Sequence, residues 1–256
     1  MIDKKKPPEF NVFGVSQPLP IRSDNSKTKD VIMLESTILF ARQGYDAVSI
    51  RDIASTIKMK PSSLYNHFSG KESLFEAVMT HAEDLYLLYF KFLDETLTKA
   101  QTLSEVLDII FREPTKMSND FTCYAFSLIQ TEQFRNEHCA KIFNDTFLDY
   151  STSFIQSHLD RCIEKGLAFP FDTRIAATLI MHTTLICINL RVHEYMDHRP
   201  PTDFEGHFRD VKNLVMALAG FSSGGPVPGP DFPGDGDDPA RGTRRKQRGP
   251  DPRSGS

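Results

Sequence analysis

The sequence predicts an all-α fold in which a small N-terminal helical domain precedes a larger helical domain. Three observations predict it. Apolar residues recur at three- and four-residue spacing through most of residues 27–221. The same stretch has no sustained alternation of polar and apolar residues and no Asn-Gly or Asp-Gly turn. Isolated glycines and prolines, which end helices, divide it into segments.

The composition is that of an ordinary soluble protein, since the 256 residues are 39% hydrophobic and 25% charged. No apolar run approaches the roughly 18–20 residues of a membrane-spanning helix, and the start MIDKKKPPEF lacks the apolar core of a secretory signal. We therefore expect a cytoplasmic protein without a membrane partner. Four cysteines stand far apart, which is typical of reduced thiols: Cys123, Cys139, Cys162 and Cys187.

Charge is distributed unevenly along the chain. Residues 26–71 hold seven Lys and Arg against four Asp and Glu, a net charge of +3. Residues 72–221 hold thirteen against twenty-two, a net charge of −9. A basic unit joined to an acidic body predicts that only the basic unit meets a polyanion.

Both ends of the chain are expected to lie outside the folded core. Residues 1–25 contain four prolines and no periodicity, which predicts a mobile arm; its Lys4–Lys6 either touch a phosphate backbone or are simply solvated. Residues 222–256 hold eight of the fourteen glycines and seven of the sixteen prolines, which predicts a disordered tail. The abrupt change of composition indicates a non-native extension, and a native disordered tail is the alternative.

Four helices are expected within residues 26–86. The first covers about residues 27–42, and Gly44 ends it in the left-handed conformation. Its buried stripe consists of Ile32, Met33, Ser36, Leu39 and Phe40. The fourth helix is long, and a capping-box pattern at Ser69–Glu72 starts it.

The second and third helices are short, and a tight turn over residues 58–60 separates them. The capping-box pattern Ser49–Asp52 starts the second helix, and Pro61 suits the first position of the third. In the second helix Ile53, Ala54 and Ile57 face inward. In the third, Leu64, Tyr65 and Phe68 lie at helical spacing, and Leu64 and Phe68 are kept for the core.

Two short helices joined by a tight turn, here residues 49–68, form the helix-turn-helix arrangement, whose second helix enters the DNA major groove by its N-terminal end. The third helix carries side chains that hydrogen-bond phosphates and base edges: Ser62, Ser63, Tyr65, Asn66 and His67. Arg51 is placed for a guanine contact and Lys71 for a phosphate. The alternative is a helical hairpin whose polar face meets only solvent.

These residues resemble the DNA-binding domain of the TetR/AcrR transcriptional regulators over about residues 26–86. The shared pattern is Leu39-Phe40, Gly44-Tyr45, Val48-Ser49, Asp52-Ile53-Ala54, Met59, Leu64-Tyr65, His67-Phe68, Lys71-Glu72 and Leu74. The resemblance implies that DNA is contacted by Arg51, Pro61, Ser62, Ser63, Tyr65, Asn66, His67 and Lys71. Lys58 stands where the family has a turn glycine, and Lys60 where it has a Ser or Thr cap. Lys60 adds positive charge and joins the candidate DNA contacts.

For residues 87–221 the resemblance implies a helical domain that binds an effector and dimerises. One helix carries two apolar stripes, Phe143, Phe147, Tyr150 and Phe154 on one side and Leu148, Ile155, Leu159 and Cys162 on the other. The next helix, capped by Asp172, is apolar nearly all round. With the helix that runs from Phe204 to Leu218, these are the candidates for a dimer bundle.

Aromatic residues of this domain are candidates for an effector pocket. They are Tyr89, Phe111, Phe121, Tyr124, Phe126 and His182. The alternative is ordinary core packing. Twenty Phe and no Trp suit an apolar or aromatic effector without identifying one.

No residue pattern indicates a metal site or catalysis. His158 and Cys162 share a helix face, and His138 adjoins Cys139, but neither pair completes a zinc ligand set. GxSxG, P-loop, HExxH and Rossmann fingerprints are absent from the sequence. We therefore predict a protein without cofactor that is not an enzyme.

The sequence thus predicts an N-terminal three-helix helix-turn-helix domain followed by a ligand-binding and dimerisation domain. The predicted function is that of a homodimeric repressor, released from a palindromic DNA operator by a small-molecule effector. One alternative is a metal- or redox-sensing regulator of the same fold. The other is a helical small-molecule-binding protein, or an enzyme, that no longer reads DNA.

Overall fold

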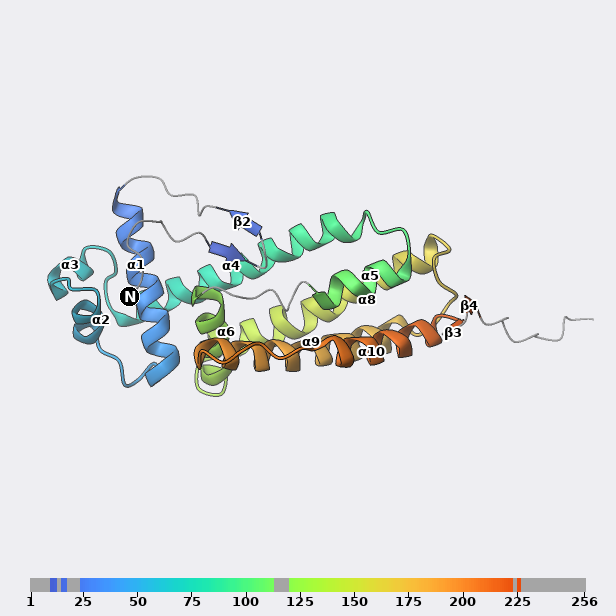
Figure 1. Ribbon diagram of the computed structural model, residues 1–256. Helices are drawn as coiled ribbons and strands as arrows, with labels where there is room; N and C mark the ends of the chain where they lie inside the picture. The colour runs from blue at the N-terminus through green and yellow to red at the C-terminus, as the bar shows by residue number, and fades with distance from the viewer. Residues whose placement is uncertain (1–9, 13–14, 18–23, 113–119, 223–224, 227–256) are drawn as a thin grey trace, which may run out of the picture.

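The computed structural model describes residues 10–12, 15–17, 24–112, 120–222 and 225–226, and it confirms the all-α fold (Figure 1). A small cluster of helices lies at one end, and a long helix leads from it into a larger helical body. The cluster consists of α1 (Asp24–Gln43), α2 (Ile50–Thr56) and α3 (Pro61–Tyr65), and the long helix is α4 (Lys71–Leu97).

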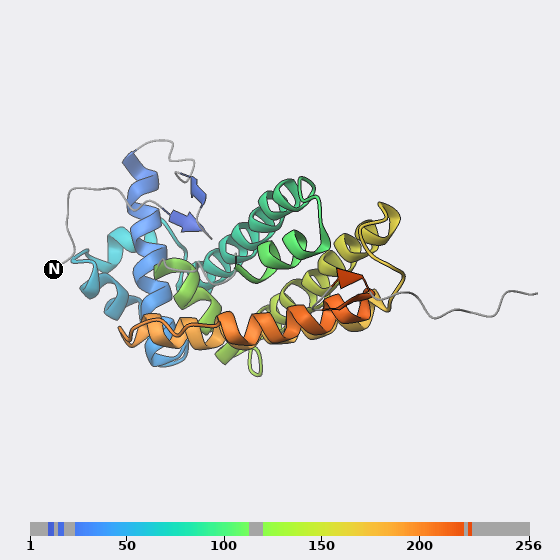
Figure 2. The same cartoon turned by 45° about the vertical axis from the view of Figure 1, so that its right-hand side comes forward.

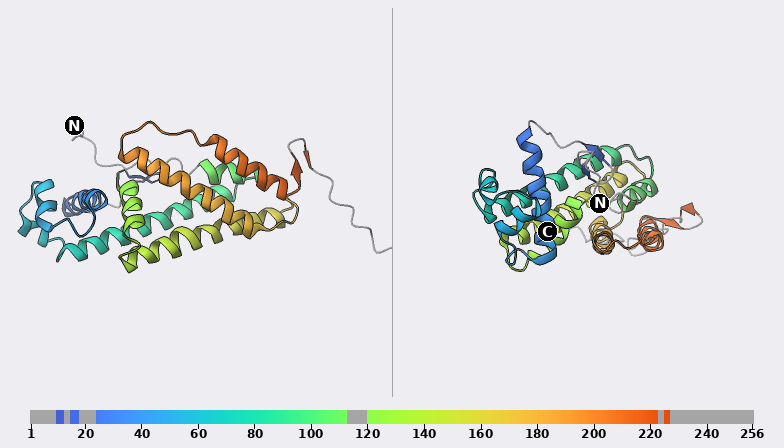
Figure 3. Two further views of the ribbon diagram at one scale, coloured as in Figure 1. Left: turned by 90° about the horizontal axis from the view of Figure 1, so that it is seen from below. Right: turned by 60° about the vertical axis from the view of Figure 1, so that its left-hand side comes forward.

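The larger body is built from the rest of the chain. Its elements are α5 (Leu103–Arg112), α6 (Asp120–Glu132), α7 (Glu137–Lys141), the π-helical segment η2 (Ile142–Tyr150), α8 (Ser151–Glu164), α9 (Thr173–Met196) and α10 (Glu205–Leu218). Helix α6 packs against α1 on one side and against α4 and α9 on others, so it joins the two parts of the molecule. Helices α9 and α10 run side by side along one flank of the body (Figures 2 and 3).

Two short antiparallel hairpins depart from the sequence prediction. Strands β1 (Phe10–Val12) and β2 (Val15–Gln17) pair within the stretch predicted to be a mobile arm. Strands β3 (Phe221–Ser222) and β4 (Gly225–Pro226) pair at the start of the predicted disordered tail. Strands of two or three residues are too short to show an alternating pattern, so they cannot be predicted from the sequence. Lys4–Lys6 and residues 227–256 lie outside the described residues.

The core of the N-terminal cluster forms as the periodicity predicts. Ile32, Met33, Ser36 and Phe40 of α1 are buried, together with Ile53, Ala54, Leu64 and Phe68, whereas Leu39 is partly buried. Ser36 satisfies its buried hydroxyl by donating to the Ile32 carbonyl at 2.6 Å. The apolar faces of α1, α2 and α3 therefore meet at one centre, which fixes the angle between α2 and α3.

The predicted apolar stripes of residues 143–162 are only partly confirmed. Phe147, Ile155, Leu159 and Cys162 are buried, but Tyr150 is exposed. The reason is that residues 142–150 are π-helical: their hydrogen bonds span five residues instead of four, so each turn is wider and the α-helical spacing of the stripe is lost. The change to α-helical spacing at Ser151 rotates the apolar stripe between the two segments.

Among the described residues, one helix, α9, combines membrane-spanning length with apolar composition, although polar residues such as His182 interrupt its apolar run. Of its most apolar stretch, 44% is buried inside the molecule. Its inner face packs against α6, α8 and α10. A helix that is packed on one side and apolar on the other also suits a core or an interface between subunits.

Candidate nucleic-acid interface

Helix α2 starts at the capping box that the sequence predicts. The Ser49 hydroxyl accepts from the backbone N–H of Asp52 at 3.3 Å, and the Asp52 carboxylate accepts from the backbone N–H of Ser49 at 2.8 Å. The Ser49 hydroxyl also donates to the Asp52 carboxylate at 2.6 Å, and this bond, followed by the bond from the Ser49 N–H, lowers the pKa of the Asp52 carboxyl. Arg51, in the first turn, is exposed. The start of α2 is thus fixed by two reciprocal bonds, and Arg51 points to solvent beside it.

The turn between α2 and α3 contains backbone strain. Lys58 has a φ of 55°, in the left-handed region that L-residues with a Cβ disfavour. Met59 follows it, and its N–H donates to the Ala54 carbonyl at 2.8 Å while its side chain packs on the core. The lysine therefore occupies a conformation that suits glycine, as its departure from the family pattern indicates.

Helix α3 presents its polar side to solvent. Pro61 is at its first turn, and Lys60 at the N-cap makes no side-chain cap bond. Leu64 is fully buried and Phe68 nearly so, which anchors α3 by one side. On the other side the Tyr65 side chain is 54% exposed. Tyr65 thus lies on the polar side of α3, away from Leu64 and Phe68, which is the side where the sequence predicts it.

The candidate DNA contacts therefore form one accessible surface, which we call the α3 surface. Its exposed members are Arg51, Lys60, Pro61, Ser62, Tyr65 and Asn66, and its half-buried members are Ser63, His67 and Lys71. Lys29 of α1 adds to it, because its ammonium lies 5.4 Å from the ring centroid of Phe68. Sequence reasoning missed Lys29, since nothing local distinguishes it from any other surface lysine.

The start of α4 differs from the predicted capping box. The N-cap residue is Gly70 rather than Ser69, and the Ser73 hydroxyl accepts from the Gly70 N–H at 3.1 Å. The predicted box is wrong because Gly70, in an extended conformation, moves the helix start by one residue. Ser73 then occupies the N3 position, from which its side chain bonds the N-cap backbone, and Glu72 remains exposed.

Lys71, the first residue of α4, is directed partly inward. Its ammonium donates to the Tyr45 carbonyl at 2.9 Å and lies 4.2 Å from the centroid of the Tyr45 ring. A second contact, with the Asp46 carbonyl, is long at 3.5 Å. An ammonium has three donors, so one remains for a phosphate.

Polar contacts connect the N-terminal cluster and the first part of α4 to the body. Arg42 donates to the Tyr124 hydroxyl at 2.5 Å, and its guanidinium lies 5.3 Å from the Tyr124 ring centroid. The Tyr45 N–H donates to the Glu132 carboxylate at 3.2 Å. His138 pairs with Glu76 at 2.6 Å. Tyr124 was predicted to line an effector pocket; instead its hydroxyl holds α1, because it lies on the side of α6 that faces away from the cavities.

The other predicted pocket residues are divided among separate places. Phe121 and Phe126 line one apolar cavity and Tyr89 lines another; each cavity has a volume of about 30 Å³. Both cavities include Tyr86 and Ile188. The remaining lining residues are Ala82, Leu85, Thr122, Ala125, Ile129 and Phe147 in the first and Phe90, Leu93, Ile110, Ser151, Ile155, Met181 and Thr184 in the second. An effector of drug size needs these walls to move apart, because such ligands occupy roughly 300–1,000 Å³.

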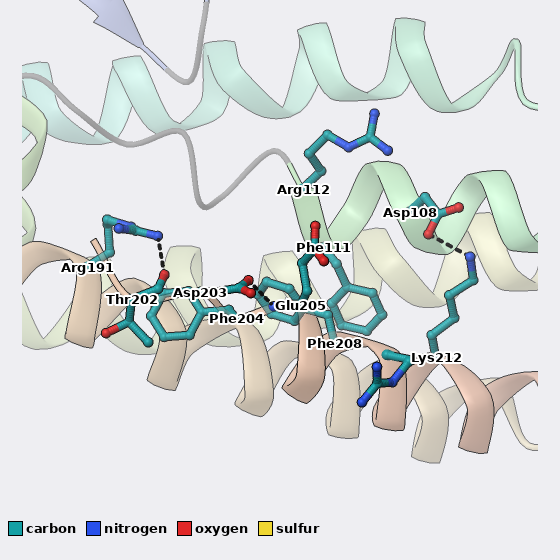
Figure 4. A pocket seen from close by; sticks show the side chains of 11 residues that line it. Asp108, Phe111, Arg112, Arg191, Thr202, Asp203, Phe204, Glu205, Phe208 and Lys212 are labelled. Atoms are coloured by element: carbon teal, nitrogen blue, oxygen red, sulfur yellow. Dashed lines mark hydrogen bonds and ion pairs between the residues drawn. The ribbon is translucent and has the colours of Figure 1, made fainter. Parts of the chain in front are cut away.

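Two predicted pocket residues do not line these cavities. His182 is exposed on α9, because the inner face of that helix is turned away from it. Phe111 lines an open groove of about 450 Å³ between α5 and α10, where it stacks on Phe208 with ring centroids 4.9 Å apart (Figure 4). The sequence groups these residues only by their aromatic character, which does not show where each side chain points in the folded protein.

The groove between α5 and α10 has mixed charge. Lys212 pairs with Asp108 at 2.6 Å across it, and Arg191 donates to the Thr202 carbonyl at 3.0 Å (Figure 4). Asp203 accepts from the backbone N–H of Glu205. The groove therefore presents charges of both signs, several of which are paired with one another or with backbone groups.

The His and Cys residues considered for a metal site have other contacts. His158 is 2% exposed, its Nε2 lies 3.2 Å from Asp94, and burial lowers its pKa. Burial also raises the pKa of the Cys139 thiol to about 12, which keeps it protonated. Within the part of the chain that the structure describes, no three His, Cys, Asp or Glu residues gather in a way that could hold a metal ion.

Comparison with known proteins agrees with the fold and with the helix-turn-helix domain. Residues 32–78 match the family model of bacterial regulatory proteins of the tetR family. Over 48 residues the chain is 42% identical to the biofilm operon icaADBC HTH-type negative transcriptional regulator IcaR of Staphylococcus aureus, a match that covers 19% of this chain and 26% of IcaR. The match therefore spans about a quarter of that relative's length.

Longer matches are more distant. The nucleoid occlusion factor SlmA of Vibrio atlanticus is 19% identical over 72% of this chain and 93% of its own. Among solved structures, GusR of Salmonella enterica has a TM-score of 0.56 at 18% identity, covering 77% of this chain and 97% of its own. FadR of Bacillus subtilis, solved with stearoyl-CoA, has a TM-score of 0.51 at 16% identity, covering 75% and 98%. The matched residues 32–78 therefore identify a helix-turn-helix domain of the tetR family of bacterial regulatory proteins, and the chain as a whole shares the fold of solved proteins such as GusR.

Proposed function

We propose that the protein is a homodimeric repressor that binds a palindromic DNA operator through the α3 surface and is released by a small-molecule effector. The observation that carries this proposal is the division of α3, whose Leu64 side is fully buried while its Ser62 and Tyr65 side is open to solvent. A helix held by one face at the tip of the molecule is what insertion into a major groove requires.

Dimerisation is supported by an apolar surface on α9 and α10, which we call the α9–α10 face. Its exposed members recur at helical spacing: Ile175, Ile186 and Leu190 on α9 and Leu214 and Leu218 on α10. The two helices run along the same flank (Figure 3). Contiguous exposed apolar residues of this kind mark an interface, and a second copy of the chain would cover them.

Effector release is supported by the two sides of α6. Phe121, Ala125 and Ile129 line the first apolar cavity, whereas Tyr124 and Glu132 hold α1 and the turn after it. A ligand that opens the cavity would displace α6 and with it the N-terminal cluster. FadR holds an acyl-CoA in a similar fold, which supports an apolar effector.

Binding to DNA tests the proposal directly. Fluorescence anisotropy with duplexes from the region upstream of the gene is expected to show saturable binding that weakens as salt rises. Tyr65→Phe should weaken binding to every sequence, because a phosphate contact carries no sequence information, whereas Ser63→Ala and Arg51→Ala should change the preferred sequence. Lys165→Ala, an exposed lysine on the end of α8, is the matched control. Absence of sequence preference in the wild type would refute the proposal.

A further inference from the structure

Glu132 is a buried carboxylate with a single hydrogen-bond partner. The residue is 7% exposed, and within the described residues its side chain accepts only from the Tyr45 N–H, at 3.2 Å, with no cation at ion-pair distance. Burial of a charge without a cation costs stability. Because native proteins rarely leave such a group poorly paired, the arrangement calls for a functional explanation.

Tyr45 is held from both sides of its backbone by opposite charges. The Glu132 carboxylate accepts from its N–H, and the Lys71 ammonium donates to its carbonyl at 2.9 Å. Its ring packs on Phe75, with centroids 4.5 Å apart, and on Phe40, at 5.4 Å. Tyr45 therefore cannot shift without moving both the Glu132 contact on α6 and the Lys71 contact at the start of α4.

The position of Tyr45 also sets the entry to the helix-turn-helix. It follows Gly44, whose φ of 86° ends α1, and it precedes the Ser49 cap of α2 by four residues. Lys71, which is predicted to contact a DNA phosphate, is thus linked to the end of α6 through a single residue, Tyr45. The same helix α6 lines the first apolar cavity with Phe121 and Ile129.

We propose that Glu132 is a positioning residue for DNA binding: through Tyr45 it holds the Lys71 ammonium where its third donor reaches a phosphate. Movement of the end of α6 then withdraws that phosphate contact. The proposal rests on the DNA-binding function proposed above and adds the residue that transmits the effector signal to it.

A double-mutant cycle on operator affinity tests the link. Glu132→Ala should weaken binding about 3- to 10-fold, the range expected from one lost hydrogen bond. It should also lower the slope of log affinity against log salt by about 0.9, as loss of one phosphate contact does. Because both changes remove the same contact, the variant Glu132→Ala/Lys71→Ala should bind no more weakly than Lys71→Ala alone.

Conservative variants separate positioning from folding. Glu132→Gln keeps an oxygen that accepts from the Tyr45 N–H and should bind like the wild type. Glu132→Met fills the same space without an acceptor and should reproduce the loss even if the alanine variant is unstable. Glu137→Ala, an exposed carboxylate at the start of α7, is the control. Additive losses in the cycle, or weaker binding at an unchanged salt slope, would overturn the proposal; a wild type that binds no DNA would instead refute the function.

Discussion

At the scale of single residues, the sharpest local constraint lies at Lys58, whose backbone adopts a left-handed conformation that suits glycine. Lys58 stands where the family pattern has a turn glycine, and its backbone has a φ of 55°. The Ser49 capping box was readable from the sequence, because its partner Asp52 is three residues away. Lys71 was different, since its inward partner is a backbone carbonyl 26 residues earlier in the chain. Contacts of that kind depend on packing, which local patterns do not encode.

The strain at Lys58 leads to a prediction about stability. Lys58→Gly should raise the free energy of unfolding by about 0.5–1 kcal/mol, because relief of the left-handed penalty of about 1–2 kcal/mol outweighs the added chain entropy of glycine. Urea unfolding followed by circular dichroism measures it. Lys58→Ala removes the same charge but keeps a Cβ, so it should give no such gain. An equal gain in both variants would show that charge, not strain, is responsible.

At the scale of elements, strong periodicity was a sound guide and changes of period were not. The stripe of α1 and the inward residues of α2 follow directly from three- and four-residue spacing. The π-helical segment Ile142–Tyr150 could not be predicted in this way, because nothing in its residues indicates a π-helical turn before packing is known. Helix α9 was predicted to be apolar all round, and its two faces acquire separate roles only when α6, α8 and α10 cover one of them.

The uncovered side of α9 gives a prediction about assembly. Ile186 is 61% exposed, so Ile186→Glu should leave the folded subunit intact while it places a charge in the α9–α10 face. Light scattering after size-exclusion chromatography should then report the mass of one chain, where the wild type gives two. Phe134→Glu makes the same chemical change at a residue that is 86% exposed in the turn after α6, and it should remain dimeric. A wild-type protein of single-chain mass would contradict the proposed interface.

At the scale of the whole molecule, the sequence predicted which parts exist but not how they are connected. The aromatic residues grouped as one pocket are divided by the structure between two small cavities, a groove and the contact with Arg42. Their grouping depends on the directions in which α5, α6 and α9 face, which only the assembled body fixes. Helix α6 has its double role for the same reason: Phe121 faces a cavity while Tyr124 faces α1.

The proposed dimer leads to the last prediction, because two α3 surfaces on one particle should bind a palindrome far more tightly than either binds alone. Half-sites about 34–36 Å apart lie on one face of the duplex, so the second contact becomes intramolecular once the first has formed. Affinity for the full operator should therefore exceed affinity for a single half-site by about 10²–10⁴-fold in the wild type. Ile186→Glu should lose most of that advantage yet bind the half-site as the wild type does, since its α3 surface is unchanged. Anisotropy titrations of both proteins on both duplexes measure the ratio. A variant that loses affinity equally on both duplexes would mean that Ile186 affects the reading surface itself, and equal wild-type affinity for both would mean that the two surfaces never engage one operator together.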